Sequence, residues 1–181
     1  MTAAERAILV GLDQILRSEK VLTSILPVVQ RVRTRLSQET GALMAWEPIP
    51  LTTYGGALPD TIKSSWVFVL RAGTNTGAER HPNSHQRMMS FQGSGDMQTG
   101  RKRKNRGDVI DWKSNLLISD SDAPPEKRWI SIPQNVWHQP VISEEGDWVV
   151  VSFHTVPAEE LIEERPQGSG QEQTKQMRYL G

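Results

Sequence analysis

The chain has 181 residues, no cysteine, and 21 Lys and Arg side chains against 21 Asp and Glu. This length suits one main domain with an appendage, and the lack of cysteine excludes thiolate catalysis, disulfide bonds and Cys-based metal sites. The balanced charge gives no reason to expect nucleic acid or an anionic membrane as the main partner, so we expect a small-molecule substrate.

The N-terminal run MTAAERAILVGLDQ contains acidic residues and has no uninterrupted apolar core ahead of a cleavage site. Nowhere do about 18 apolar residues follow one another, which is the length that a membrane-spanning helix needs. We therefore expect a soluble, cytoplasmic protein.

Residues 1–43 are predicted to form a helical extension, because no aromatic residue precedes Trp46 and apolar residues recur at helical spacing. Thr2 followed three residues later by Glu5 is a capping-box pattern, which predicts a helix that starts near Ala3. The two apolar stripes consist of Ile8, Leu9, Leu12, Ile15 and Leu16, and of Leu22, Ile25, Leu26, Val29, Val32 and Leu36.

Pro27 is tolerated only in the first turn of a helix, so two arrangements of the second stripe are open. Either Ser24 caps a helix that ends at Gly41, or the two stripes meet at a kink. The stripes need a surface to cover, either the chain's own barrel or a second subunit, and we expect a homodimer.

Residues 44–157 are predicted to form one antiparallel, mainly β barrel. Short runs rich in Val, Ile, Trp and Phe alternate with Gly, Pro, Asn and Asp, and no helical pattern lies between them. The runs are SSWVFVLRA, QRMMSFQG, DVIDW, RWISI, WHQPVI and DWVVVSFHTV. The basic run RKRKNRG at 101–107 is interpreted as a solvated hairpin loop, and residues 158–181 as a short helix, AEELIEE, followed by a polar tail.

The stretch at 73–93 combines groups that can bind a metal. Strand alternation points Glu79 and His81 to the same face, and after a bend at 82–83 a new strand can bring Gln86 back into the same space. His138 begins a later strand. Two imidazoles, one carboxylate and one amide suit a divalent first-row metal, although solvated turn residues and histidines bonded to the backbone would give the same composition.

The spacing of these residues resembles the cupin motifs. The first cupin motif runs Gly, five residues, His-x-His, three or four residues, Glu, six residues, Gly. Here the series is Gly73, five residues, Glu79, one residue, His81, four residues, Gln86, six residues, Gly93. Glutamate thus stands where the first histidine usually is, and glutamine where the glutamate usually is.

The second cupin motif runs Gly, five residues, Pro-x-Gly, two residues, His, three residues, Asn. This chain has Pro133, one residue, Asn135, two residues, His138, with Lys127 and Ile142 in place of the outer Gly and Asn. Asparagine and glycine both tolerate a left-handed backbone, so Asn135 suits the turn.

The resemblance implies an antiparallel cupin-type β-barrel, or jelly roll, that holds one divalent ion (Fe, Mn, Ni or Zn) on Glu79, His81, Gln86 and His138. It implies a metal-dependent enzyme acting on a small organic substrate, and we favour an oxygenase of dioxygenase type because two His and one carboxylate remain. A lyase or isomerase acting on a sugar or uronate is the first alternative, since glutamine occurs at a metal position in some such cupins. A non-catalytic small-molecule-binding module is the second.

Two further histidines need placing. His85 shares the parity of His81 and is a rival to Gln86 as a ligand if the bend lies elsewhere. His154 is a candidate acid or base on the face of its strand that also carries Trp148, Val150 and Ser152, and a hydrogen-bonded core histidine is the competing interpretation. No separate organic cofactor is predicted.

Overall fold

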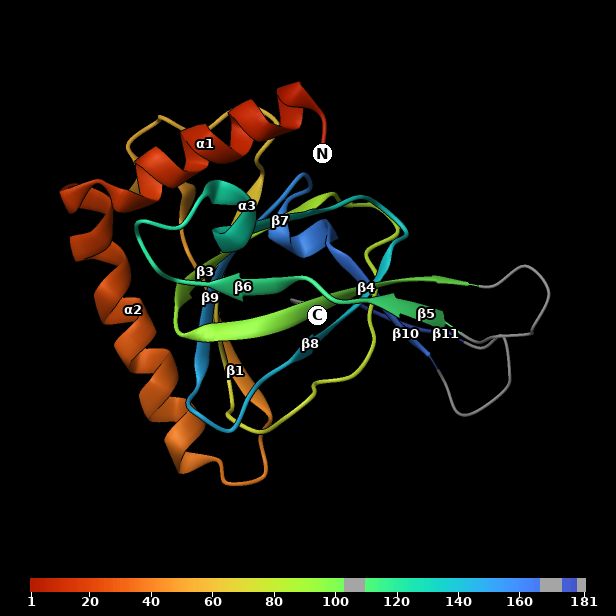
Figure 1. Ribbon diagram of the computed structural model, residues 1–181. Helices are drawn as coiled ribbons and strands as arrows, with labels where there is room; N and C mark the ends of the chain where they lie inside the picture. Colours follow the sequence, from red (N-terminus) through yellow and green to blue (C-terminus); the bar gives the residue numbers. More distant parts are fainter. Residues whose placement is uncertain (103–109, 167–173, 179–181) are drawn as a thin grey trace.

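Strand-forming runs rich in Val, Trp and Phe build two facing antiparallel sheets in the computed structural model, which describes residues 1–102, 110–166 and 174–178 (Figure 1). The first sheet has the order β1 (Met44–Pro48), β2 (Ser64–Leu70), β9 (Trp148–His154), β3 (Gln86–Gln92) and β7 (Trp129–Ile132). The second is built on β4 (Ser94–Lys102), which pairs with β5 (Ile110–Lys113), β6 (Leu116–Ile118) and β8 (Trp137–Val141). This architecture confirms the prediction of a mainly β, antiparallel barrel with N-terminal helices.

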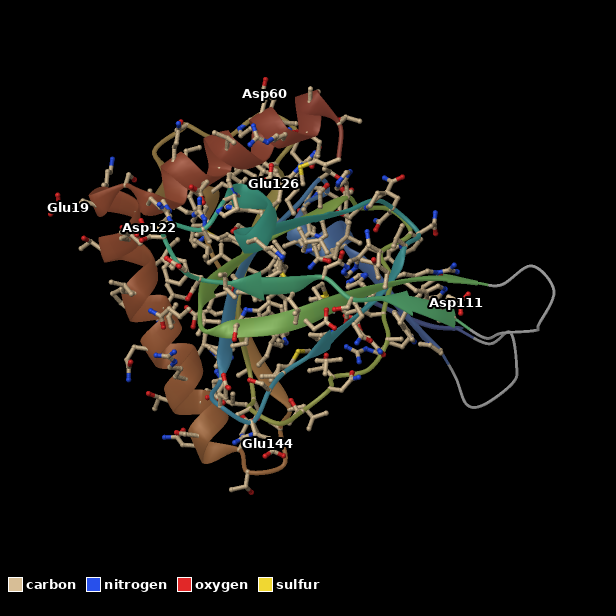
Figure 2. The ribbon with its side chains drawn as sticks, viewed as in Figure 1. Glu19, Asp60, Asp111, Asp122, Glu126 and Glu144 are labelled. Carbon is tan, nitrogen blue, oxygen red and sulfur yellow. The ribbon has the colours of Figure 1, made fainter. Side chains whose placement is uncertain are left out.

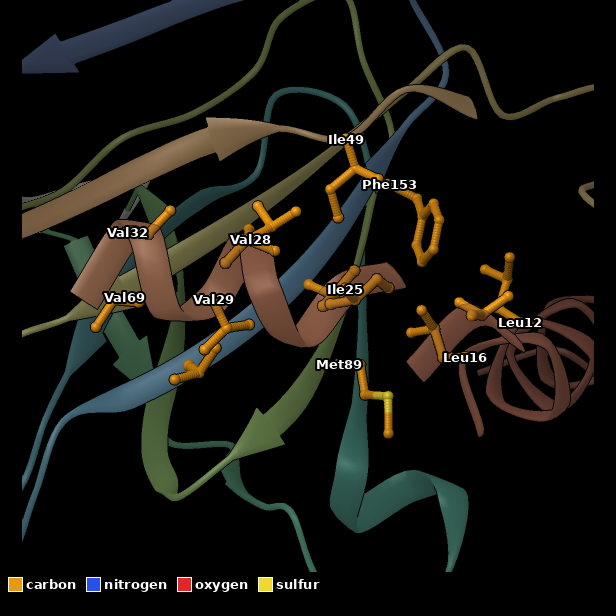
Figure 3. Close-up of a cluster of buried hydrophobic side chains, with 14 of the residues drawn as sticks. Leu12, Leu16, Ile25, Val28, Val29, Val32, Ile49, Val69, Met89 and Phe153 are labelled. Atoms are coloured by element: carbon orange, nitrogen blue, oxygen red, sulfur yellow. The ribbon is translucent and has the colours of Figure 1, made fainter. Parts of the chain in front are cut away.

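Strand alternation divides the first sheet into two apolar faces. One face packs beneath the helices, and Figure 3 shows Val69, Met89 and Phe153 of this face beside helix residues such as Ile25. The other face packs against the second sheet through residues that include Trp66, Phe68, Met88, Trp148 and Val150, together with Met97 and Leu117. The helices therefore cover the outside of the barrel and leave its interior to the site.

Helix α1 (Ala3–Arg17) starts where the capping pattern predicts, with the Thr2 hydroxyl accepting from the backbone N–H of Glu5 at 3.2 Å. Helix α2 (Glu19–Gln38) does not start at Ser24, and Pro27 lies inside it. The two stripes meet at a break, as in the second arrangement, and the break lies at Ser18, whose backbone is extended with ψ 137°. Packing of the apolar face on the sheet outweighs the preference of proline for a first turn.

The helix predicted for AEELIEE is wrong. Ala158–Glu160 forms a short 3₁₀ turn, and strand β10 (Ile162–Pro166) pairs with β11 (Thr174–Arg178). The acidic run has good helix propensity, but pairing with other strands satisfies its backbone groups and decides the conformation. The remainder of the predicted polar tail, residues 167–173 and 179–181, lies outside the described residues.

Strands β4 and β5 pair antiparallel, from Thr99 with Lys113 to Lys102 with Ile110, as expected for the two arms of a hairpin. The interpretation of RKRKNRG as its solvated loop falls on residues 103–109, which lie outside the described part of the chain. The remaining elements are two short helical segments, η1 (Leu51–Tyr54) and α3 (Pro125–Arg128). Among the described helices, none is both long and apolar enough to cross a membrane.

Candidate metal site

Glu79, His81 and His138 meet because two segments far apart in sequence run antiparallel beside each other. The backbone N–H of each of Glu79 and His138 donates to the carbonyl of the other at 2.8 Å, and Asn135 N–H donates to His81 O at 3.1 Å. Asn135 adopts the left-handed conformation, with φ 61°, that the motif turn predicts. The turn after β7 therefore brings His138 to the segment that carries the other two residues.

The side chains of these three residues form a compact, buried group, called here the donor cluster. One ligand atom from each lies within 4.8 Å of the others. Oε1 of Glu79 is 3.3 Å from Nε2 of His138 and 4.0 Å from Nε2 of His81. The exposed fractions are 9% for Glu79, 3% for His81 and 1% for His138.

Burial distinguishes Glu79 from the acidic side chains that Figure 2 labels at the periphery of the molecule, among them Glu19, Asp60 and Glu144. A carboxylate at the surface is solvated by water, whereas a buried one needs a hydrogen bond or a cation. The surroundings of Glu79 must therefore supply such partners.

The hydrogen bonds of the two imidazoles determine which nitrogen faces the cluster. Nδ1 of His81 lies 3.0 Å from the carbonyl oxygen of Ile162, and Nδ1 of His138 lies 3.1 Å from that of Val136. A carbonyl oxygen can only accept, so each Nδ1 carries a proton, and each Nε2 of a neutral ring carries the lone pair. This is the tautomer in which a histidine can bind a metal through Nε2.

Nε2 of a neutral His138 and Oε1 of Glu79 are then two acceptor atoms 3.3 Å apart, and no hydrogen bond satisfies the buried Nε2 within the described residues. Two facing acceptors repel each other unless a cation lies between or beside them. That cation is either a proton on the imidazole or a metal ion. The residues present thus fit a divalent metal: two imidazoles of the right tautomer and one carboxylate.

The charge states of the cluster also suit metal binding. Burial raises the pKa of Glu79, but the interaction with His138, with the charges of His81 and Arg165, outweighs burial and lowers the pKa to about 2. Burial, followed by the charge of His138, lowers the pKa of His81 to about 4. At neutral pH the carboxylate is ionised and His81 is neutral, which are the forms that coordinate metals.

Arg165 contacts Glu79 from strand β10 and was not found from the sequence. Its Nη2 donates to Glu79 Oε2 at 2.8 Å, its Nη1 donates to Thr76 O at 2.8 Å, and its Nε donates to Glu163. The run IEERP resembles any solvated charged segment, so no local pattern in it indicates the site. Only the pairing of β10 in the folded chain shows that Arg165 belongs to the site.

Gln86 begins β3 with the parity of Met88, which faces the barrel interior. Its Oε1 is buried and has no hydrogen-bond partner in the part of the chain that the structure describes. The amide oxygen is therefore available as the fourth ligand that the cupin motif implies, and that role stays a prediction.

His85 is not brought to the donor cluster, because it lies one residue before Gln86 and faces the opposite side of the sheet. Its Nε2 is 2.6 Å from Ser131 Oγ and 3.6 Å from Oε1 of Glu5 on helix α1. The structure gives no support to His85 as a rival ligand. The physical reason is that the bend ends before His85, so strand alternation directs Gln86 inward and His85 outward.

His154 lies inside the barrel next to the donor cluster, with 1% of its surface exposed. Its ring is 5.0 Å from the His81 ring and nearly perpendicular to it. Nδ1 is 3.2 Å from Ser84 Oγ, and Nε2 is 3.2 Å from Ser152 Oγ. Burial, and then the charges of His81 and His138, lower the pKa of His154 well below its ordinary value, so its ring is neutral at pH 7.

Because the pKa values of buried His81 and His154 are lowered, we expect the metal-free protein to lose stability as the pH falls from about 7 toward 4. In the unfolded chain the imidazoles bind protons near pH 6.5, whereas folded His81 binds one only near pH 4. The unfolded state thus binds more protons in this window, so lowering the pH favours unfolding, by roughly 3 kcal/mol for His81. Urea unfolding of chelator-treated protein at several pH values measures this loss.

His154→Gln provides the matched comparison for that titration, because glutamine can hydrogen-bond to both serines and does not titrate. The variant should lose less stability between pH 7 and 4 than the wild type. A free energy of unfolding that stays constant over this range would contradict the prediction.

Comparison with known proteins gives likeness only at the level of structure. Neither a protein-family model nor a curated protein sequence matches the chain. Similar solved structures include the capsular polysaccharide assembling protein CapF from Staphylococcus aureus, with 16% identity, 63% of this chain and 28% of that chain covered, and a TM-score of 0.45. An oxalate oxidase complex with glycolate has 11% identity, coverages of 64% and 52%, and a TM-score of 0.45.

The 11S globulin from Wrightia tinctoria has 14% identity, coverages of 71% and 28%, and a TM-score of 0.49. All three are cupin-fold proteins. The matched segments span at most 52% of the length of these neighbours. At such identities and TM-scores the likeness carries no conclusion about function, and the donor cluster must be interpreted from its own geometry.

Proposed function

We propose that the chain is a metal-dependent enzyme of the cupin type that acts on a small organic substrate. Glu79, His81 and His138 would hold one divalent ion, with Gln86 as the fourth ligand. The observation that carries this proposal is the 3.3 Å approach of Glu79 Oε1 to the Nε2 of His138, a contact between two acceptors that a bound cation would stabilise.

A bound ion would supply Lewis-acid or oxygen-activating chemistry to a substrate at its open positions. We favour an oxygenase, because two His and one carboxylate are the ligand types of oxygen-activating iron sites. The chain itself would exclude water through the buried interior and orient the ligands through backbone carbonyls. His154, neutral and hydrogen-bonded to two serine hydroxyls, would line the cavity beside the cluster as a hydrogen-bonding group.

A non-catalytic binding module is the second candidate, and one observation favours it. Arg165 donates to Oε2 of Glu79 at 2.8 Å, so the chain already supplies a positive charge to this buried carboxylate. Such a cluster would be stable without a metal and would bind a neutral or anionic small molecule.

Elemental analysis of protein purified without added metal separates the two candidates. The enzyme proposal expects about one Fe, Mn, Ni or Zn per chain and, with Fe or Mn, oxygen uptake with a panel of small organic acids and diols that stops on treatment with a chelator. A folded protein that contains no metal and binds none of these ions would reject it. The expected homodimer and cytoplasmic location belong to the same proposal, and sedimentation at micromolar concentration tests the former.

A further inference from the structure

Strand β10 lies directly against the segment that carries Glu79 and His81. Arg80 and Glu164 exchange both backbone hydrogen bonds at 3.0 Å. Just beyond them, the side chain of Asn83 donates to Glu160 O at 2.7 Å and accepts from Ile162 N–H at 3.1 Å. These contacts fix the register of β10 on the ligand-bearing segment.

In this register β10 contacts a side chain of the donor cluster at each of its ends. The carbonyl of Ile162 accepts from Nδ1 of His81 at 3.0 Å, and the guanidinium of Arg165 donates to Oε2 of Glu79 at 2.8 Å. Arg165 is itself held by Thr76 O and Glu163. These two contacts fix the guanidinium of Arg165 independently of its hydrogen bond to Glu79.

We propose that Arg165 is a positioning residue of the metal site and that β10 is part of the site. The inference rests on the proposed function. A carboxylate can rotate and can present either oxygen or both to a metal. Because Arg165 binds Oε2, it leaves Oε1 directed at the Nε2 atoms of the two histidines. Hydrogen bonds of this kind to metal ligands raise metal affinity by about 10- to 100-fold.

The neighbouring residue Glu164 offers a matched control. Its Oε2 accepts from Nε of Arg80 at 2.7 Å, so it also ties β10 to the ligand-bearing segment, but through Arg80, which is not a proposed ligand. Removing this ion pair weakens the docking of the strand without removing a contact to the cluster. Glu164→Gln thus tests the structural role of β10 separately from the positioning role of Arg165.

The experiment compares Co²⁺ binding by the wild type, Arg165→Met, Arg165→Lys and Glu164→Gln, using competition with a chromophoric chelator and the visible spectrum of the bound Co²⁺. Arg165→Met should bind Co²⁺ about 10- to 100-fold more weakly, with an altered spectrum. Arg165→Lys keeps the positive charge but loses the planar guanidinium and its several N–H donors, so it should restore part of the affinity. Glu164→Gln should keep the wild-type spectrum and an affinity within about twofold of the wild type.

An Arg165→Met protein with the affinity and spectrum of the wild type overturns the inference and leaves the proposed function standing. Equal losses in Arg165→Met and Glu164→Gln also overturn it, since docking of β10 alone would then explain both. If Arg165→Met does not fold, the Arg165→Lys variant provides the test. The inference expects its Co²⁺ spectrum to differ from that of the wild type, and an unchanged spectrum would refute the inference. A wild type that binds no Co²⁺ refutes the proposed function, and the inference falls with it.

Discussion

Replacing His138 with alanine should reduce metal affinity by about 100-fold or more and leave the purified protein with little metal. His138 supplies the Nε2 that lies 3.3 Å from Glu79 Oε1, and only 1% of its surface is exposed. Loss of a direct ligand should cost at least as much as loss of an outer contact, for which 10- to 100-fold is typical. Elemental analysis and competition with a chelator measure both quantities.

His85→Ala is the control for this experiment, because it removes an imidazole of the same chain on the other face of the sheet. His85 is bonded to Ser131 and lies near Glu5, so its loss should leave the metal content unchanged. A His138→Ala protein that keeps its metal, or a His85→Ala protein that loses it, would contradict the assignment of ligands. Unfolding curves of both variants show whether each remains folded.

The spacing of the two motifs was enough to predict that Glu79, His81 and His138 come together. That prediction came from the resemblance to the cupin motifs. Local rules add only that Glu79 and His81 share a face and that Asn135 permits the left-handed turn before His138. The same rules left His85 and Gln86 open, because a change of one residue in the position of the bend reverses which of them faces inward.

Arg165 and strand β10 could not be predicted, because long-range pairing determines them. The run AEELIEE has helix-forming residues, but its second half is a strand that pairs with β11 and is bonded to Arg80 and Asn83. The start of helix α2 at Ser24 was wrong for a similar reason, since an apolar face of many residues on the sheet overcomes one unfavourable proline. Periodicity identifies an apolar face well, but it does not locate breaks such as Ser18.

The anchoring of helix α1 leads to the second large prediction: Asp13→Ala should destabilise the protein by about 3–5 kcal/mol. Asp13 is buried, and its carboxylate accepts from both terminal nitrogens of Arg128, from Nη2 at 2.9 Å, and from Nε1 of Trp129 at 2.8 Å. Without it, the buried guanidinium of Arg128 keeps the contact of its Nε with Ala123 O but has lost its closest anion. Such a loss is a large fraction of a typical domain stability of about 5–15 kcal/mol.

Urea unfolding at pH 7 tests this prediction against two comparisons. Glu126→Ala removes the exposed ion pair of Arg6 with Glu126, which also links α1 to α3, and should leave the unfolding midpoint nearly unchanged because water solvates both groups. The double variant Asp13→Leu with Arg128→Met replaces the buried charges by apolar groups and should recover most of the stability that Asp13→Ala loses. If Asp13→Ala has no larger effect than Glu126→Ala, the buried pair does not hold α1 against the barrel. The apolar contacts of Leu9, Leu12 and Leu16 must then provide that attachment.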